Sequence, residues 1–224
     1  MPIRLDYIFE WGPTLDQWRA LLAGAGVDLL VGVLGFAFAA ILGLFIASMR
    51  LSSSKLFRVP AGIYVQVMRG IPLYVFLLWI FFGLATVAGV RFTPFQAMVI
   101  ALAFTGSAYT AEIFRGGIQS VAPGQREAAK SLGLNAISTF RDVVLPQALR
   151  IAVPPLGNTL IGLVKGATIM SVIGEPDMVF VASDINTTYF TPFEAFAAVA
   201  LLLIVMILIL STVVTLIERL LRLP

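Results

Sequence analysis

The sequence predicts an all-α integral membrane protein with about five transmembrane helices, in one domain that covers residues 1–224. Composition is the first reason: 59% of the residues are hydrophobic and 12% are charged, whereas about a quarter of a soluble domain is charged. Mean hydropathy is accordingly high, at +0.98. The second reason is a set of long uncharged stretches, because a helix needs about 20 apolar residues to cross a bilayer. The third is that basic residues gather between these stretches.

The apolar stretches predict spans at about 27–49, 62–88, 94–114, 150–180 and 194–217. Four spans are built on uncharged segments, which are Leu29–Met49, Ile71–Val90, Phe92–Ala111 and Ala195–Ile217. The first span begins too far from the N-terminus, and is too long, to be a cleavable signal peptide. The fourth contains a lysine with several prolines and glycines, so we expect a discontinuous helix there, as transporters use around solute sites.

The distribution of positive charge predicts the orientation, because loops rich in lysine and arginine stay in the cytoplasm. Basic clusters follow spans one, three and five: Arg50, Lys55, Arg58 and Arg69, then Arg115, Arg126, Lys130, Arg141 and Arg150, then Arg219 and Arg222. Five spans put these clusters on one side and leave Arg4, Arg19 and Arg91 on the other. We therefore predict an N-terminus outside the cytoplasm and a C-terminus inside it.

The sequence also excludes several kinds of chemistry. Cysteine and histidine are both absent, which removes thiolate nucleophiles, the usual general base and the commonest metal ligands. The chain has no phosphate-binding Gly-Lys-Ser/Thr loop, so any ATP hydrolysis has to occur on another subunit. We accordingly expect no catalytic residue, no metal site, no cofactor in this chain and no nucleic-acid partner.

Residues 116–146 form a charged island between spans three and four. Pro123 suits the first turn of a helix, because its missing N–H is not needed there. The helix is expected to run to about Leu132, since Gly133 suits the left-handed residue that ends a helix.

A second short helix is expected to follow, with Asn135 as its cap. Ile137, Phe140 and Val144 are spaced to lie on one apolar face of this helix, and Pro146 is expected to end it. Such an arrangement fits either a docking surface for a soluble partner or an ordinary interfacial helix.

The spacing within this island resembles the EAA loop of the membrane subunits of bacterial ATP-binding cassette importers. That loop reads Glu-Ala-Ala, three residues, glycine, nine residues, an aliphatic residue, one residue, Leu-Pro, and Val143 fills the aliphatic position here. In that family the loop forms a coupling helix that docks on the ATPase subunit. The resemblance implies that the coupling residues are Glu127, Ala128, Ala129, Gly133, Leu145 and Pro146.

Further motifs resemble the polar amino acid uptake branch of the same importers, namely Arg69–Leu73, Tyr109–Ile118, Leu145–Arg150, Lys165–Ile173 and Thr191–Glu194. The resemblance implies an ABC importer type I-like transmembrane domain in the bacterial inner membrane, with a periplasmic N-terminus and a cytoplasmic C-terminus. It implies import of amino acids or related small polar solutes by alternating access. The implied partners are an ABC ATPase subunit dimer that binds ATP, a periplasmic solute-binding protein, a second permease chain, identical or homologous, and membrane lipids.

Span four carries most of the candidates for the solute pathway. Lys165 is costly in hydrocarbon, so it either lines a watery pathway or reaches an interface by snorkelling. Thr168 and Ser171 share a helix face, where they could bind a solute or bond back to the preceding turn. Asn158 could bond backbone groups that the neighbouring prolines leave free. Tyr109, which lies in one of the resembling motifs, is the fifth candidate.

Gate or structural candidates lie near the span ends, and they are Arg69, Pro72, Glu112, Arg115, Glu175 and Asp177. Glu112 and Arg115 are three residues apart, so an ion pair between them is expected. Glu175 and Asp177 flank a proline toward the outer side, where they would either form part of an outer gate or sit in solvent.

The alternative reading is an autonomous carrier or channel driven by an ion gradient. A broken fourth span with a lysine fits that idea. The island at 116–146 fits it poorly, because such a carrier needs no segment for docking a partner. An ion-driven carrier also requires acidic or histidine residues inside the spans to relay protons. The nearest candidate is Glu112, which lies at a span end.

Overall fold

The structure is a computed structural model that describes residues 7–221, which are almost entirely helical. Arg4 and Arg222 of the predicted charge pattern lie outside these described residues. Four helical segments in the described part are long and apolar enough to cross a membrane, and a bent helix pair raises the number to five. The structure therefore agrees with the predicted all-α membrane fold.

The helices follow one another along the chain with short connections. In order they are α1 (Gly12–Asp16), α2 (Trp18–Leu51), α3 (Lys55–Gly70), α4 (Leu73–Leu78), the π-helical η1 (Trp79–Gly83), α5 (Leu84–Ala88), α6 (Pro94–Gln119), α7 (Pro123–Ser131), α8 (Ala136–Ser138), the π-helical η2 (Thr139–Val144), α9 (Leu145–Ala167), the 3₁₀-helical η3 (Thr168–Ile173), α10 (Met178–Tyr189) and α11 (Pro192–Leu221).

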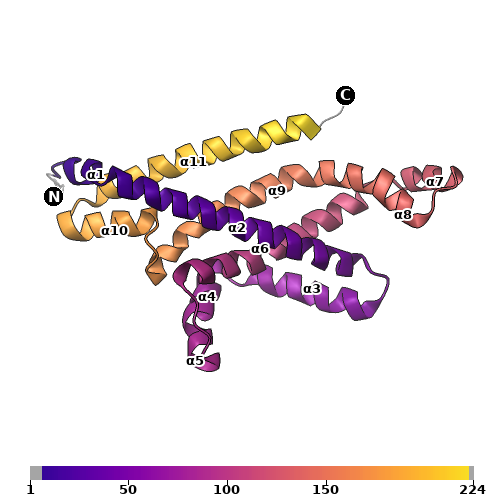
Figure 1. Cartoon of the computed structure of the whole chain (residues 1–224), viewed down its shortest axis with the longest axis horizontal. Coiled ribbons are helices and arrows are strands. Elements are labelled where there is room, and N and C mark those ends of the chain that lie inside the picture. Colours follow the sequence, from indigo (N-terminus) through magenta and orange to yellow (C-terminus); the bar gives the residue numbers. More distant parts are fainter. Residues whose placement is uncertain (1–6, 222–224) are drawn as a thin grey trace, which may run out of the picture.

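The centre of the molecule is formed by α2, α6 and α9, which pack on one another (Figure 1). A side-chain carbon added at Gly32 of α2 would lie 2.5 Å from Val164 Cγ2 and 2.6 Å from Val164 Cα of α9. This approach is close because small residues let membrane helices bring their backbones together. The Thr110 hydroxyl of α6 donates to the Ala39 carbonyl of α2 at 2.7 Å, which ties α6 to the same helix.

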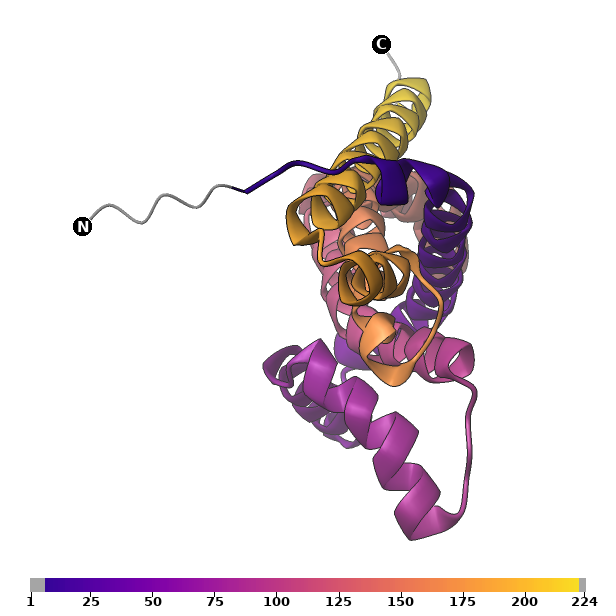
Figure 2. The ribbon, with the colours of Figure 1, turned by 90° about the vertical axis from the view of Figure 1, so that its left-hand side faces the viewer.

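The segment predicted as one span at 62–88 differs in the structure. It divides into α3 and the run from Leu73 to Ala88, which meet at an angle of 102°. Ile71 is extended, with φ −87° and ψ 125°, because the residue before a proline avoids helical geometry. Pro72 then precedes α4 as its cap residue. As a result, α4 to α5 leave the bundle as an arm, which Figure 2 shows.

The segment predicted as a span at 150–180 also has other bounds. The helix starts earlier, because η2 leads directly into α9, and it ends at Ile173 with the last turns in η3. Gly174 follows with a left-handed φ of +86°. Pro154 and Pro155 lie inside α9 without ending it, so the break in this segment comes after η3 rather than at these prolines.

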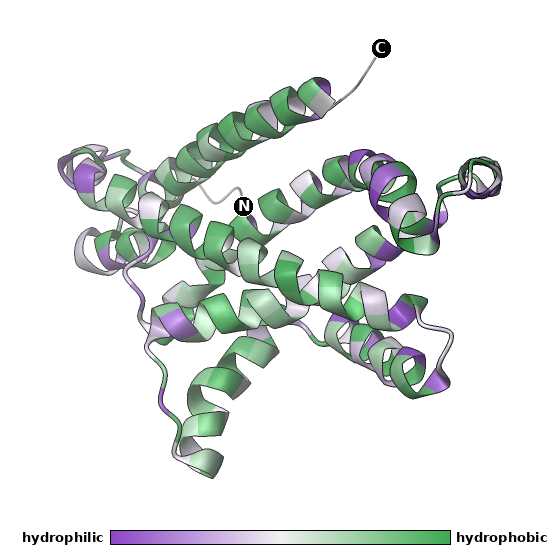
Figure 3. Ribbon diagram, turned by 45° about the vertical axis from the view of Figure 1, so that its right-hand side comes forward, coloured by the Kyte–Doolittle hydropathy of each residue, from purple (hydrophilic) through white to green (hydrophobic). Residues whose placement is uncertain are grey.

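Hydrophobic residues run along the long helices (Figure 3), and many of their large apolar side chains are exposed. On α11, for example, Leu201 and Leu208 are each 61% exposed, and only 11% of the most apolar window of that helix is buried. Such a surface would be unfavourable in water. It is the surface expected of a helix that faces lipid.

Glu194, in the first turn of α11, binds the segment that precedes α1. Its carboxylate is fully buried and accepts hydrogen bonds from the Tyr7 hydroxyl and from the Glu10 backbone N–H, the latter at 2.7 Å. The hydrogen bond to this carboxylate raises the pKa of Tyr7 above its ordinary value. The contact joins the segment before α1 to the start of α11, 187 residues farther along the chain.

Candidate functional site

The island between α6 and α9 forms the helix, turn and second helix that its sequence predicts. Helix α7 ends at Ser131, and Gly133 has a left-handed φ of +78°. The Gly133 N–H donates to the Lys130 carbonyl at 2.9 Å, which closes the end of the helix as glycine-terminated helices do. The Asn135 side chain accepts from the Ser138 N–H at 2.9 Å. This cap starts the second helix.

The three residues of the Glu-Ala-Ala motif divide between two sides of α7. Ala129 is buried, with 3% exposure, on a helix that packs against η2. Glu127 and Ala128 are exposed. The helix therefore uses one alanine for its own packing and leaves the other two motif residues free to meet a partner. In Figure 1, α7 and α8 lie at the opposite end of the molecule from α1 and α10.

The second helix of the island differs from the sequence prediction at its end. Of the three residues predicted to lie on its apolar face, Ile137 is 78% exposed and Phe140 44% exposed, whereas Val144 is buried. Phe140 and Val144 lie in η2, which is π-helical. Pro146 does not end the helix, because it lies in the first turn of α9, where no N–H is required. Leu145 is half-buried and Pro146 exposed.

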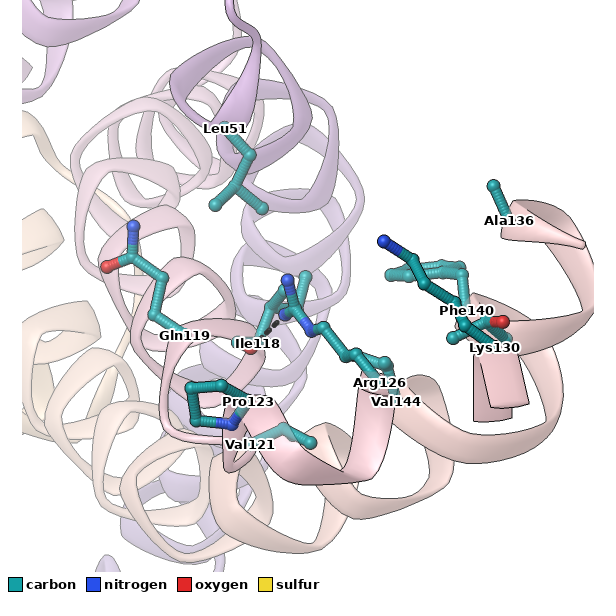
Figure 4. Close-up of a pocket in the computed structure, with 11 residues that line it drawn as sticks. Leu51, Ile118, Gln119, Val121, Pro123, Arg126, Lys130, Ala136, Phe140 and Val144 are labelled. Carbon is teal, nitrogen blue, oxygen red and sulfur yellow. Dashed lines mark hydrogen bonds between the residues drawn. The ribbon is translucent and has the colours of Figure 1, made fainter. Parts of the chain in front are cut away.

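A cavity of about 620 Å³ lies between the end of α6, α7 and η2. Figure 4 shows Arg126, Lys130 and Phe140 among the side chains that line it. Arg126 Nη2 donates to the Ile118 carbonyl at 2.9 Å, and this bond fixes α7 to the last turns of α6. Through η2 the island is also continuous with α9.

Two pathway candidates lie on one exposed side of α9. Asn158 and Lys165 are both exposed and are seven residues apart, which is about two helical turns. Lys165 makes no ion pair with any of residues 7–221. The Asn158 side chain likewise makes no hydrogen bond within those residues, whereas the Thr159 hydroxyl donates to the Pro155 carbonyl at 2.9 Å. Thr159 is a residue that the sequence reasoning missed.

The hydroxyls of the other two candidates in this segment bond to their own helix. Thr168 donates to the Lys165 carbonyl at 2.9 Å, and Ser171 donates to the Thr168 carbonyl at 3.1 Å. Both side chains are half-buried. Of the two alternatives that the sequence left open, the structure shows bonding back to the preceding turn.

The gate candidates form two separate contacts on α6. Glu112 pairs with Arg115 at 2.6 Å, as expected, and also with Arg50 of α2 at 3.2 Å. The pair with Arg50 could not be predicted from local spacing, because 62 residues separate Arg50 from Glu112. One turn earlier on α6, the ring of Tyr109 contacts Arg69 of α3. The Arg69 guanidinium lies over this ring, 5.3 Å from its centroid. This contact joins α3, just before the bend at Pro72, to α6.

Asp177 lies at the other end of the molecule and is fully buried, so it does not sit in solvent. It caps α10 by accepting from the Phe180 N–H at 2.6 Å, and Glu175 beside it is half-buried. Asp28 of α2 is also fully buried and accepts from the Met178 N–H at 3.4 Å. The sequence reasoning missed Asp28, although an acidic residue directly before an uncharged stretch is unusual enough to be a signal.

Together, the membrane-spanning helices, the polar stripe that Asn158 and Lys165 form on α9 and the projecting helix α7 define the class as a membrane component of a transport system. The chain matches the family model described as "Binding-protein-dependent transport system inner membrane component" over residues 21–223. It belongs to this family, and it is therefore an inner membrane protein of a transport system that works with a binding protein. Family membership favours this reading over an autonomous carrier or channel.

Curated relatives cover most of the chain. A probable amino-acid ABC transporter permease protein YckA of Bacillus subtilis (strain 168) is 38% identical over 79% of this chain and 77% of its own length. A probable glutamine ABC transporter permease protein GlnM of the same strain is 35% identical, over 82% of this chain and 85% of the relative. The histidine/lysine/arginine/ornithine transport system permease protein HisM of Escherichia coli (strain K12) is also 35% identical, over 83% of this chain and 82% of the relative.

Solved structures agree with the fold. A crystal structure of an amino acid ABC transporter with histidines contains a chain that is 38% identical, with a TM-score of 0.89 over 95% of this chain and 99% of that one. An inward-facing structure of the MetNI methionine ABC transporter, at 19% identity, has a TM-score of 0.74 over 95% and 99%, and this similarity shows the fold alone. The predicted ABC importer type I-like transmembrane fold is confirmed.

Proposed function

We propose that this chain is the permease subunit of an ATP-driven importer for amino acids or related small polar solutes. The observation that carries the proposal is α7, which exposes Glu127 and Ala128 while it is fixed to the membrane helices. The relatives named above support the solute class, because their names refer to amino acids. ATP would be bound and hydrolysed by a separate ATPase dimer, so this chain would contribute coupling and a pathway.

The mechanism follows from how α7 is attached. The Arg126 bond ties α7 to α6, Ala129 packs α7 toward η2, and η2 continues into α9. A displacement of α7 by closing ATPase subunits would therefore move α6 and α9 with it. Since α9 carries the exposed Asn158 and Lys165, this motion would open and close a polar pathway by rigid-body alternating access.

A second permease chain, identical or homologous, follows from the polar stripe on α9. Asn158 lies toward the middle of α9 and Lys165 in its last turn, and both are exposed. Polar side chains within membrane helices face a bundle interior or a watery cavity rather than lipid. A facing chain would enclose such a cavity. Asp177, Glu175 and the bend at Pro72 would then lie around its outer part, with a periplasmic solute-binding protein delivering the solute to that side. This arrangement requires a periplasmic N-terminus and a cytoplasmic C-terminus.

The test compares valine substitutions at two glycines, one in the turn that ends α7 and one outside α7. Gly133→Val is strained, because φ is +78° there and left-handed geometry costs L-residues about 1–2 kcal/mol. Gly26→Val is the control, because Gly26 is helical in α2 with open space around it and lies outside α7, and valine is no worse than glycine in a helix. We expect Gly133→Val to lose ATP-dependent amino acid uptake and co-purifying ATPase at normal membrane insertion, while Gly26→Val keeps both. Equal uptake by the two variants would contradict the coupling role.

A further inference from the structure

A second cavity, of about 850 Å³, lies along the membrane face of α2, α6 and α9. Its lining is mostly apolar and includes Leu44, Phe45, Phe114 and Leu149. Leu44, Phe45 and Leu149 are 52%, 65% and 44% exposed, so the cavity opens sideways toward the bilayer. It is therefore placed to take a hydrocarbon chain rather than a polar solute.

This apolar cavity adjoins the cavity beside α7. Leu51, Ile118 and Phe140 line both of them, so the two form one continuous groove that runs from the face of the bundle to the coupling helix. Phe140 is 44% exposed and stands where the two parts meet. One molecule could therefore occupy both parts.

The part of the groove beside α7 is positively charged. Arg126 and Lys130 are its charged lining residues, and no acidic side chain of residues 7–221 lines it. Arg126 donates one N–H to the Ile118 carbonyl, and its other guanidinium N–H groups remain available to a ligand. Lys130 makes no ion pair within the described part of the chain. An anion with a hydrocarbon tail complements this arrangement.

The groove lies on the other side of α9 from the polar stripe. Leu149 lines the groove, whereas Asn158 and Lys165 are nine and sixteen residues farther along. At 3.6 residues per turn these separations are about 2.5 and 4.4 turns, which places both polar residues on roughly the opposite side of the helix. A molecule in the groove would thus not block the proposed pathway or the face that a second permease chain would cover.

We propose that the groove binds one anionic phospholipid of the cytoplasmic leaflet, with its phosphate at Arg126 and Lys130 and an acyl chain between α2 and α9. The assignment to this leaflet rests on the proposed function, which makes the α7 side cytoplasmic. The lipid would hold α7 at the membrane surface through the headgroup and α2 and α9 through the chain. It would therefore stabilise the position of the coupling helix relative to the helices it moves.

The test uses the full chain, purified with the subunits that accompany it and placed in nanodiscs of phosphatidylcholine with varied phosphatidylglycerol. Retained lipid is identified by native mass spectrometry. The double variant Arg126→Gln/Lys130→Gln is expected to lose about 30-fold in preference for phosphatidylglycerol, because each basic residue contributes roughly five-fold near anionic lipid. The control Arg141→Gln/Arg150→Gln removes the same charge from η2 and the start of α9, outside both cavities, and it should keep the preference.

A second measurement covers the case in which the double variant does not fold. The chain has no cysteine, so Ser48→Cys places a single fluorophore in the apolar part of the groove, which Ser48 lines. Nitroxide-labelled phosphatidylglycerol should quench this fluorophore more strongly than nitroxide-labelled phosphatidylcholine in an otherwise unchanged chain. Equal quenching would overturn the proposal.

The remaining outcomes separate the lipid from other ligands. Loss of the preference in both double variants would show a general charge effect and overturn the site. Displacement of the lipid by millimolar inorganic phosphate would identify a phosphate site instead. Loss of co-purifying ATPase from Arg126→Gln/Lys130→Gln with an unchanged lipid preference would make the surface a protein contact. Absence of ATPase from the unchanged chain would contradict the proposed function alone, because the lipid measurement does not depend on it.

Discussion

The contact between α2 and α9 at Gly32 gives a quantitative prediction. In Gly32→Ala the new methyl would lie 2.6 Å from Val164 Cα and 2.5 Å from Val164 Cγ2, whereas carbon atoms in contact are about 3.5–4.0 Å apart. The helices would have to separate by roughly 1 Å. Overpacking of this kind costs about 1–3 kcal/mol, which corresponds to a fall of roughly 2–12 °C in Tm for a chain of this size.

Gly26→Ala is the matched control for this prediction. Gly26 lies in the same helix with open space around it, so alanine there gains helix propensity, about 1 kcal/mol, without a clash. The assay is thermal unfolding of each detergent-purified variant, followed by tryptophan fluorescence. Val164→Ala in the Gly32→Ala background should recover part of the loss, since it removes Cγ2 but not Cα. Equal Tm values for Gly32→Ala and Gly26→Ala would refute the packing argument.

Three further predictions concern single side chains. Arg50→Gln should destabilise the chain by about 0.5–1 kcal/mol in the same unfolding assay, because it breaks the ion pair with Glu112. Arg58→Gln, at an exposed position, should have no effect. Equal effects of the two substitutions would show that the ion pair does not contribute to stability. Asp177→Ala should cost about 1 kcal/mol through loss of the α10 cap, and Asp177→Asn should keep most of it; a loss with asparagine as large as with alanine would contradict the capping role. Lys165→Ala should change the concentration dependence of solute uptake in reconstituted vesicles, and unchanged uptake at all solute concentrations would leave Lys165 as a snorkelling residue.

Sequence reasoning identified the features that depend on local chemistry. The uncharged stretches located the membrane helices, because hydrocarbon tolerates few charges. The turn after α7 was predicted at Gly133, and the cap of the next helix at Asn135, since both depend on one residue and its immediate neighbours. The pair between Glu112 and Arg115 was predicted for the same reason, from helical spacing alone.

The features that the sequence did not reveal depend on distant contacts or on backbone geometry. Arg50 and Asp28 meet partners 62 and 150 residues away, and no local pattern indicates such pairs. The 102° bend before α4 falls in an uncharged stretch where hydropathy gives no sign of it. Pro154 and Pro155 suggested a break that α9 does not make, because a membrane helix tolerates prolines when neighbouring groups satisfy the freed backbone.

The length of α2 has a mechanical consequence. Its 34 residues extend about 51 Å, which exceeds the ~30 Å of hydrocarbon in a bilayer. Asp28, about 15 Å from the start of α2, holds the start of α10, and Arg50 near the other end holds Glu112 of α6, about 33 Å farther along the axis. A stiff rod attached at two such points behaves as a lever: a tilt imposed at one membrane surface is delivered at the other. Bilayer thickness, which sets the tilt of an overlong helix, would then set the resting position of that lever.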